Sequence, residues 1–122
     1  WKLLEDVEFN GYTFWAEPTE YLKFGESYVS GNAMRQRAKE FNLNLGQRHA
    51  EYLLNHQEGI VLTKIQERQQ DLTLVFPGTV WQDRYGDRYV PVLYLDRGRW
   101  NLAWFWLDGS WGSNDYLIRS YT

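Results

Sequence analysis

Two histidines are the first side chains to test for metal binding or acid–base chemistry. His49 and His56 lie seven residues apart in a segment with helical periodicity, so a helix would place them on one face, two turns apart. Metal-binding pairs on a helix usually lie three or four residues apart, whereas seven residues span about 10 Å along the axis. One ion cannot bridge that distance. The spacing therefore indicates surface or capping histidines.

Four aspartates raise the separate question of a carboxylate pair. Each flanks a predicted turn, where Asp side chains commonly accept hydrogen bonds from the backbone; they are Asp83, Asp87, Asp108 and Asp115. Two of them could meet at one end of a sheet, as a glycosidase or a calcium site requires. The spacing does not demand this, and the sequence contains no calcium-loop, phosphate-loop or nucleophile-elbow pattern. We predict no catalytic residue, no metal and no cofactor, and a domain that folds without metal.

An aromatic hairpin is the main candidate for a binding surface. Residues 88–95 and 100–107 alternate as two strands around a four-residue loop, with Leu95 opposite Trp100. The same face then carries Leu93–Leu102, Pro91–Trp104 and Tyr89–Trp106, and the other face carries Tyr94–Asn101, Val92–Ala103 and Val90–Phe105. Both faces are apolar, although a sheet with one solvated side needs only one apolar face.

Three explanations for the second apolar face stay open. Curvature of the sheet could bury both faces, a second copy of the chain could cover one, or a ligand or partner could bind there. Tyr89, Trp104 and Trp106 together would form a larger patch than a soluble monomer usually exposes. Trp111 lies among small residues and is either a plug over the core or an exposed anchor. The candidate ligand- or partner-binding residues are therefore Tyr89, Trp100, Trp104, Trp106 and Trp111.

Composition restricts the possible functions. The 122 residues include 7 Trp, 9 Tyr and 6 Phe but no Cys, with a net charge of −3. An acidic chain, with a pI near 5.3, is not typical of nucleic-acid binders that neutralise phosphate. There is no apolar run of about 18 residues and no signal-like start, so no membrane contact is expected. Trp1 rather than Met opens the sequence, so an initiator or leader could precede it. We predict one domain over residues 1–122.

Strands and helices can be assigned from turn signals and periodicity. Asn10-Gly11 predicts a hairpin between residues 7–9 and 12–15. A first helix, capped by Ser30 or Asn32, carries Met34, Ala38 and Phe41 on its apolar face. A second helix is predicted from Asn44, with Gln47 in a capping box, to a stop at Gly59; its apolar face is Ala50, Leu53 and Leu54.

The remaining segments complete an α+β pattern. Residues 60–70 fit a third short helix or an exposed loop, and the two-residue period of strands begins at Leu72. Asp83 to Gly86 forms a turn. The predicted fold is two or three helices packed on one side of a curved, mostly antiparallel sheet. The sheet is either open or a half-barrel.

The chain also resembles a group of small bacterial proteins. The similar stretches are Ala50–Gln57, Val75–Trp81, Arg88–Pro91 and the tail from Trp106 to Asp115. In these, the chain resembles uncharacterised proteins encoded by mobile integron gene cassettes. The resemblance implies a bacterial, cytoplasmic protein without an established activity, and it assigns no catalytic residues.

The sequence thus predicts a non-enzymatic binding or self-associating module that uses its aromatic sheet. Its partner would be its own copy (a homodimer), another protein, or a small apolar or sugar-like ligand, but no nucleic acid and no membrane. The alternative is a small enzyme with an aromatic-lined pocket and Asp or His acid–base residues.

Overall fold

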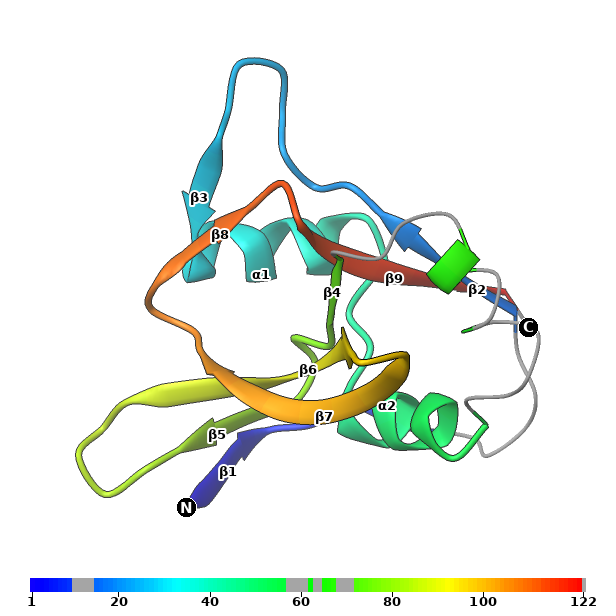
Figure 1. Cartoon of the computed structure of the whole chain (residues 1–122). Helices are drawn as coiled ribbons and strands as arrows, with labels where there is room; N and C mark the ends of the chain where they lie inside the picture. The colour runs from blue at the N-terminus through cyan, green and yellow to red at the C-terminus, as the bar shows by residue number, and fades with distance from the viewer. Residues whose placement is uncertain (10–14, 57–61, 63–64, 68–71, 122) are drawn as a thin grey trace.

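A curled, mostly antiparallel sheet organises the fold (Figure 1). The computed structural model describes residues 1–9, 15–56, 62, 65–67 and 72–121. Its strands are β1 (Lys2–Glu5), β2 (Trp15–Thr19), β3 (Tyr28–Ser30), β4 (Thr73–Val75), β5 (Val80–Gln82), β6 (Arg88–Asp96), β7 (Arg99–Trp106), β8 (Ser110–Gly112) and β9 (Asp115–Tyr121). The helices are α1 (Gly31–Glu40) and α2 (Gln47–Leu54), and residues 62 and 65–67 are also helical. The predicted α+β fold class is confirmed.

Strand β6 lies at the centre of the sheet. The order is β1-β5-β6-β4-β9-β2, and β7 pairs with the other side of β6. All these pairs are antiparallel except β4 with β9. Strands β3 and β8 form a separate antiparallel pair, which α1 contacts. Every one of these strand pairings except the β6–β7 hairpin and the β5–β6 hairpin joins segments that are distant in the sequence.

The β6–β7 hairpin has the predicted register. Leu95 pairs with Trp100, Pro91 with Trp104 and Tyr89 with Trp106. The loop is tighter than predicted, because Asp96 and Arg99 also pair and leave two residues in the turn. Arg97 and Gly98 have φ of 52° and 77°, and two positive φ values match the turn that best fits twisted antiparallel strands.

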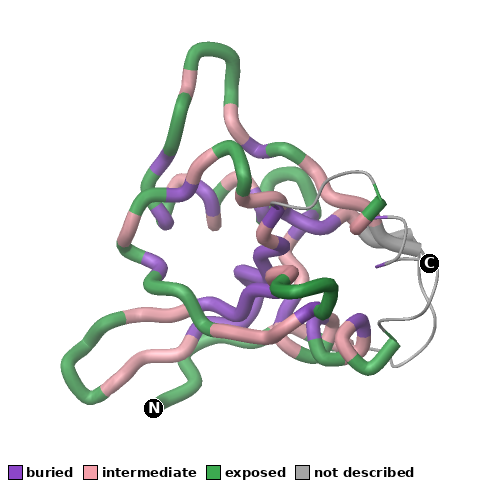
Figure 2. The backbone as a smooth tube through the Cα atoms, in the orientation of Figure 1, coloured by how far each residue is buried: buried purple, intermediate pink, exposed green. Residues whose placement is uncertain are grey.

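Both faces of β6 are buried, and each face contributes to a different hydrophobic cluster. Leu93 packs in a cluster with Ala50 and Leu53 of α2. Val90 and Val92 pack in a second cluster with residues of α1, Met34 and Ala38. Figure 2 shows buried residues gathered where the central strands cross. The two apolar faces predicted for residues 88–95 are thus both used by the core.

Helix α1 begins as predicted and ends before its last predicted apolar residue. The Ser30 hydroxyl accepts a hydrogen bond from the Ala33 amide at 3.2 Å. Met34 and Ala38 are buried. Phe41 follows the end of the helix as its C-cap and is exposed, because the chain leaves the helical path there.

Helix α2 is capped by a distant residue, which corrects the prediction of Asn44 with Gln47. The N-cap is Gly46, and the Gln47 amide donates to the hydroxyl oxygen of Thr79 at 2.7 Å. A side chain on Gly46 would meet that same hydroxyl at 2.6 Å, so the residue must be small. Asn55 ends the helix. The predicted stop at Gly59 lies outside the described residues.

The two histidines do not share a helix face, because His56 lies beyond the end of α2. His49 Nδ1 accepts a hydrogen bond from the Gly46 amide at 3.1 Å, and burial lowers the pKa of His49. His56 donates from Nδ1 to the Tyr52 carbonyl oxygen at 2.7 Å. Both rings therefore serve local structure.

The N-terminal region pairs differently from the predicted hairpin. The strand is residues 2–5 instead of 7–9, and it pairs with β5. Strand β2 pairs with β9. Phe9 packs against His49, with ring centroids 4.9 Å apart. The Asn10-Gly11 turn lies outside the described residues. In the part of the chain described here, no helix has the length and apolar character needed to cross a membrane.

Candidate functional site

A group of aromatic side chains lies on one face of three adjacent strands. Trp81 on β5 pairs with Tyr89 on β6, and Tyr89 pairs with Trp106 on β7. Directly paired residues of antiparallel strands point to the same face, and so do residues two apart on one strand. Trp104 therefore shares the face of Trp106. We call Trp81, Tyr89, Trp104 and Trp106 the aromatic strip.

The outer end of the aromatic strip is open to solvent. Trp106 is 53% exposed and Trp104 38%, while Trp81 and Tyr89 are half-buried. Leu3 on β1 pairs with Trp81 and is also exposed, so it continues the apolar surface onto a fourth strand. Contiguous apolar surface of this kind commonly marks a binding site.

A single amide orients two of the four rings. The side-chain oxygen of Gln47 accepts hydrogen bonds from the indole nitrogens of Trp81 at 2.8 Å and Trp104 at 3.1 Å. Gln47 is the first residue of α2, so the helix and two strands together hold these indoles. With their N–H groups already bonded, both rings are held in place before any ligand arrives, which lowers the entropy cost of binding.

Tyr89 is held by polar contacts and by stacking. Its hydroxyl donates to an Asp83 carboxylate oxygen at 3.3 Å, and partial burial together with that carboxylate raises its pKa. The ring of Trp1 stacks on Tyr89 with centroids 4.6 Å apart and planes 17° from parallel. The Tyr89 ring thus accepts a flat partner on its face.

Two predicted site residues belong to the core. Trp100 is 3% exposed and lies in the cluster under α2. Trp111 is 2% exposed, and its indole nitrogen donates to the Leu107 carbonyl oxygen at 2.9 Å. Of the five candidates, Tyr89, Trp104 and Trp106 are brought together on one face, and Trp100 and Trp111 are placed elsewhere.

Three residues of this surface are not among those predicted from the sequence. Trp81 had a usable signal, because extending the Asp83–Gly86 turn into a hairpin places Trp81 opposite Tyr89. Leu3 and Gln47 had no such signal. Leu3 pairs with Trp81, and Gln47 accepts a hydrogen bond from Trp81, which is far along the chain from both.

Three of the four aspartates act as turn or ion-pair residues. Asp83 accepts from the amides of Tyr85 and Asp87, at 2.9 Å and 3.0 Å. Asp108 forms an ion pair with Arg88 at 2.5 Å. Asp87 follows the same turn and is exposed. These positions match the turn-flanking role that the sequence predicts for Asp.

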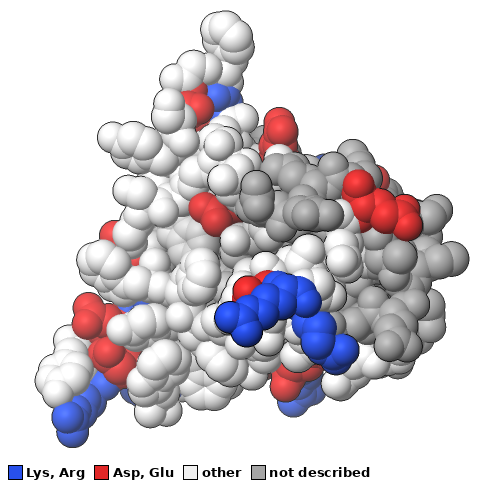
Figure 3. Space-filling model, viewed as in Figure 1, with Lys and Arg blue, Asp and Glu red and all other residues white. Residues whose placement is uncertain are grey.

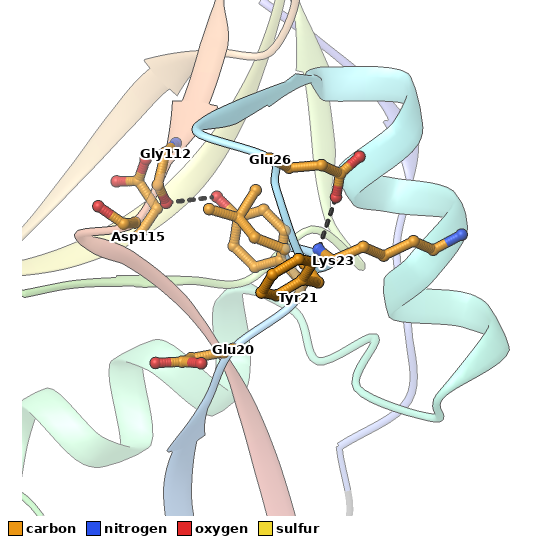
Figure 4. Close-up of a pocket in the computed structure, with 9 residues that line it drawn as sticks. Glu20, Tyr21, Lys23, Glu26, Gly112 and Asp115 are labelled. Carbon is orange, nitrogen blue, oxygen red and sulfur yellow. Dashed lines mark hydrogen bonds between the residues drawn. The ribbon is translucent and has the colours of Figure 1, made fainter.

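The fourth, Asp115, lines a pocket of about 440 Å³ between the β2–β3 connection and the β8–β9 turn (Figure 4). Figure 4 shows Tyr21 pointing toward Gly112, with Asp115 beside it and Glu26 on the other side. The Tyr21 hydroxyl donates to the Gly112 carbonyl oxygen at 3.0 Å, and the Asp115 carboxylate accepts from the Gly112 amide at 2.8 Å. Burial raises the pKa of Tyr21, with a smaller contribution from Asp115.

The pKa values of Asp115 and Glu26, two carboxyl groups of this pocket, are shifted in opposite directions. Burial raises the pKa of Asp115. Two hydrogen bonds from the Arg37 guanidinium, at 2.7 Å and 2.9 Å, hold the pKa of Glu26 at about 2. Asp115 is therefore the carboxylate best suited to carry a proton here.

Neither a metal site within the described residues nor a relative of the chain is found. Among the described residues, no group of three or more His, Asp or Glu side chains could hold a metal ion. No protein-family model, curated protein or solved structure matches the chain. The resemblance to integron-cassette proteins stays a prediction.

Proposed function

We propose that this protein is a non-catalytic binding module and that the aromatic strip is its recognition surface. One observation carries the proposal: the β5–β6–β7 register aligns Trp81, Tyr89 and Trp106 on one face, and that face is open at Trp106. The core uses both faces of β6, yet it leaves the end of β7 uncovered by described residues. A fold that needed these rings only for stability would bury them.

The chemistry of the strip favours a ligand with a flat apolar face. The stacking of Trp1 on Tyr89 supports this preference, because it shows a flat aromatic group packed against a ring of the strip. The face of a sugar ring, a small apolar molecule, or an apolar protein surface meets this requirement. The neighbouring Gln47 and Asp83 hold the rings by hydrogen bonds and would orient polar groups of the ligand at the border.

Replacing Trp106 with alanine should weaken binding at least tenfold while leaving the fold intact. Large aromatic residues at the centre of an interface often contribute 2 kcal/mol or more, and about 1.4 kcal/mol is tenfold in affinity. The probes are soluble oligosaccharides of glucose, xylose and N-acetylglucosamine, followed by tryptophan fluorescence, and the protein itself, followed by sedimentation velocity.

Phe105→Ala is the matched control, because Phe105 is 40% exposed on the same strand but points to the opposite face. The control should bind the oligosaccharide probes as the wild type does. Equal losses of oligosaccharide binding in both variants, or a wild type that neither binds a probe nor self-associates, would contradict the proposal.

Catalysis in the Tyr21 pocket is the second candidate function. It is favoured by the raised pKa of Asp115, since a carboxyl group that holds its proton to a higher pH than usual is better suited to serve as a general acid. Tyr21 and Phe24 supply the aromatic lining that the sequence-based alternative requires. This function requires a substrate that the wild type turns over and that the Asp115→Asn variant does not.

The same variant should raise the melting temperature at pH 7. Because the pKa of Asp115 is raised in the folded state, ionisation of this group opposes folding above that pKa. This destabilising contribution disappears as the pH falls toward the ordinary value of 3.8. Asparagine cannot ionise and keeps an oxygen for the Gly112 amide. The difference in melting temperature between the variant and the wild type, measured from pH 7 to pH 4, should therefore become smaller as the pH falls. A lower melting temperature of the variant at pH 7 would show that the folded state stabilises the ionised Asp115 carboxylate. That result would contradict the role of Asp115 as a proton donor.

A further inference from the structure

Among the described residues, the seven-stranded sheet has three strands that pair on one side only, and they differ in how they avoid further pairing. The three are β1, β2 and β7. Strand β1 is four residues long, carries Lys2 and Glu5, and has an irregular register between Leu3 and Glu5. Strand β2 contains Pro18. Short length, charge, irregularity and proline are the usual means of blocking an exposed edge.

Strand β7 has none of these protections over its second half. Residues 102–106 read Leu-Ala-Trp-Phe-Trp, with no charge, glycine or proline. Trp104, Phe105 and Trp106 are consecutive and exposed, so both faces of the strand are open near its end. A long apolar edge of this kind is a template for another strand.

The hydrogen-bond pattern identifies the backbone groups that are available. The Leu107 amide donates to the Arg88 carbonyl oxygen at 2.8 Å, so Leu107 and Arg88 form a hydrogen-bonded pair. Such pairs alternate along an antiparallel ladder, so the amides and carbonyls of Leu102 and Trp104 point away from β6. Pro91 fits this assignment. It lies opposite Trp104, and its carbonyl accepts from Phe76 on the other side of β6. Within the described residues, no backbone group pairs with those of Leu102 and Trp104.

The two ends of β7 carry opposite net charge. The turn that precedes the strand has a net charge of +1 from Asp96, Arg97 and Arg99; Figure 3 shows basic side chains gathered there, at the front of the view. The other end has a net charge of −1 from Asp87, Arg88 and Asp108. Antiparallel pairing of β7 with the β7 strand of a second copy brings the positive end of each strand to the negative end of the other. Parallel pairing would bring like charges together.

We propose that β7 pairs antiparallel with β7 of a second copy, so that two sheets join into one across a two-fold axis. The occupant is a second copy because the edge is complementary to itself in charge and because the two-fold arrangement closes after two chains. Leu102 and Trp104 of each copy supply the new backbone hydrogen bonds. This contact uses the backbone edge of β7, to which Trp104 contributes only its backbone, whereas the aromatic strip uses side chains on the face of the sheet, so it goes beyond the proposed function.

Leu102→Pro tests the edge directly. Proline removes one outward amide and is tolerated at edge positions whose amide faces solvent. Sedimentation velocity over a concentration series should give a dimer of twice 14.7 kDa for the wild type. The dissociation constant should rise at least tenfold for Leu102→Pro and stay unchanged for Leu102→Val, which keeps the amide and an apolar side chain. Thermal melting checks that each variant is folded.

If the Leu102→Pro variant does not fold, Phe105→Lys is the second test of the edge. It places a charge on an exposed side chain of the edge and leaves the backbone intact. It should also weaken the dimer at least tenfold. A wild type that is monomeric at all concentrations overturns the proposal. A dimer that survives Leu102→Pro and Phe105→Lys but is lost in Trp106→Ala also overturns it, and places the contact on the aromatic strip instead.

Discussion

Gly31→Ala is expected to lower the free energy of unfolding by about 3 kcal/mol, at the upper end of the cost of overpacking a core. Gly31 is the first residue of α1, and a Cβ atom there would lie 1.7 Å from the carbonyl oxygen of Leu107 and 2.7 Å from its carbon. Both are backbone atoms, which cannot rotate away as a side chain can. The helix and the connection after β7 would have to separate.

Two hydrogen bonds keep the Leu107 backbone from yielding. Its amide donates to the Arg88 carbonyl at 2.8 Å, and its carbonyl accepts from the Trp111 indole at 2.9 Å. Moving this segment would therefore disturb β6 and β8 as well as α1. Urea denaturation measures the effect, and Gly112→Ala on β8 is the control, because its nearest contact would be an ordinary 3.5 Å to the Ser27 carbonyl oxygen. Similar stabilities for the two variants would show that α1 is not tightly packed at its first residue.

Trp111→Ala is expected to destabilise the fold by about 3–5 kcal/mol, the usual cost of removing a buried Trp side chain. The side chain is buried in the cluster that joins α1 to β6, and it bonds to the same Leu107 carbonyl that contacts Gly31. Trp111→Phe should cost less, because most of the ring volume stays and only the indole hydrogen bond and part of the packing are lost.

The comparison with Trp106→Ala separates a core residue from a surface one. Trp106→Ala should change the melting temperature little, since this side chain is more than half exposed. Trp111→Ala should lower it strongly. A stable Trp111→Ala protein that had lost ligand or partner binding would instead make Trp111 the exposed anchor considered from the sequence.

Local sequence signals predicted the local structure well. The register of β6 with β7 follows from alternating apolar residues on both sides of a short turn, and the structure has the predicted pairs. Ser30 caps α1, and the turn from Asp83 to Gly86 forms with its amide–carbonyl bond at 3.2 Å. In each case the interacting residues are near neighbours along the chain, so their types and spacing carry the information.

Two features were predicted correctly in kind but at the wrong residues. Both depend on contacts between residues that are distant in the sequence. A capped helix was predicted from Asn44, but the cap comes from Thr79, 32 residues beyond the Gln47 amide that it accepts from. A strand was predicted at residues 7–9, but the N-terminal strand is residues 2–5 because those residues find a partner in β5. Neither partner is adjacent in sequence, so no local pattern contains it.

For the candidate site too, one part follows from the local sequence and another part only from the tertiary structure. By itself the sequence determined that Tyr89, Trp104 and Trp106 share one face of a hairpin, because strand periodicity and turn length settle that. The tertiary structure alone decided which tryptophans stay accessible. Trp100 and Trp106 point to the same face of β7, yet one is buried and the other is exposed. The difference is what packs on each ring: Trp100 lies in the cluster that contains residues of α2, whereas Trp106 belongs to neither buried cluster. Burial depends on neighbours brought from far along the chain, and residue type and spacing do not encode it.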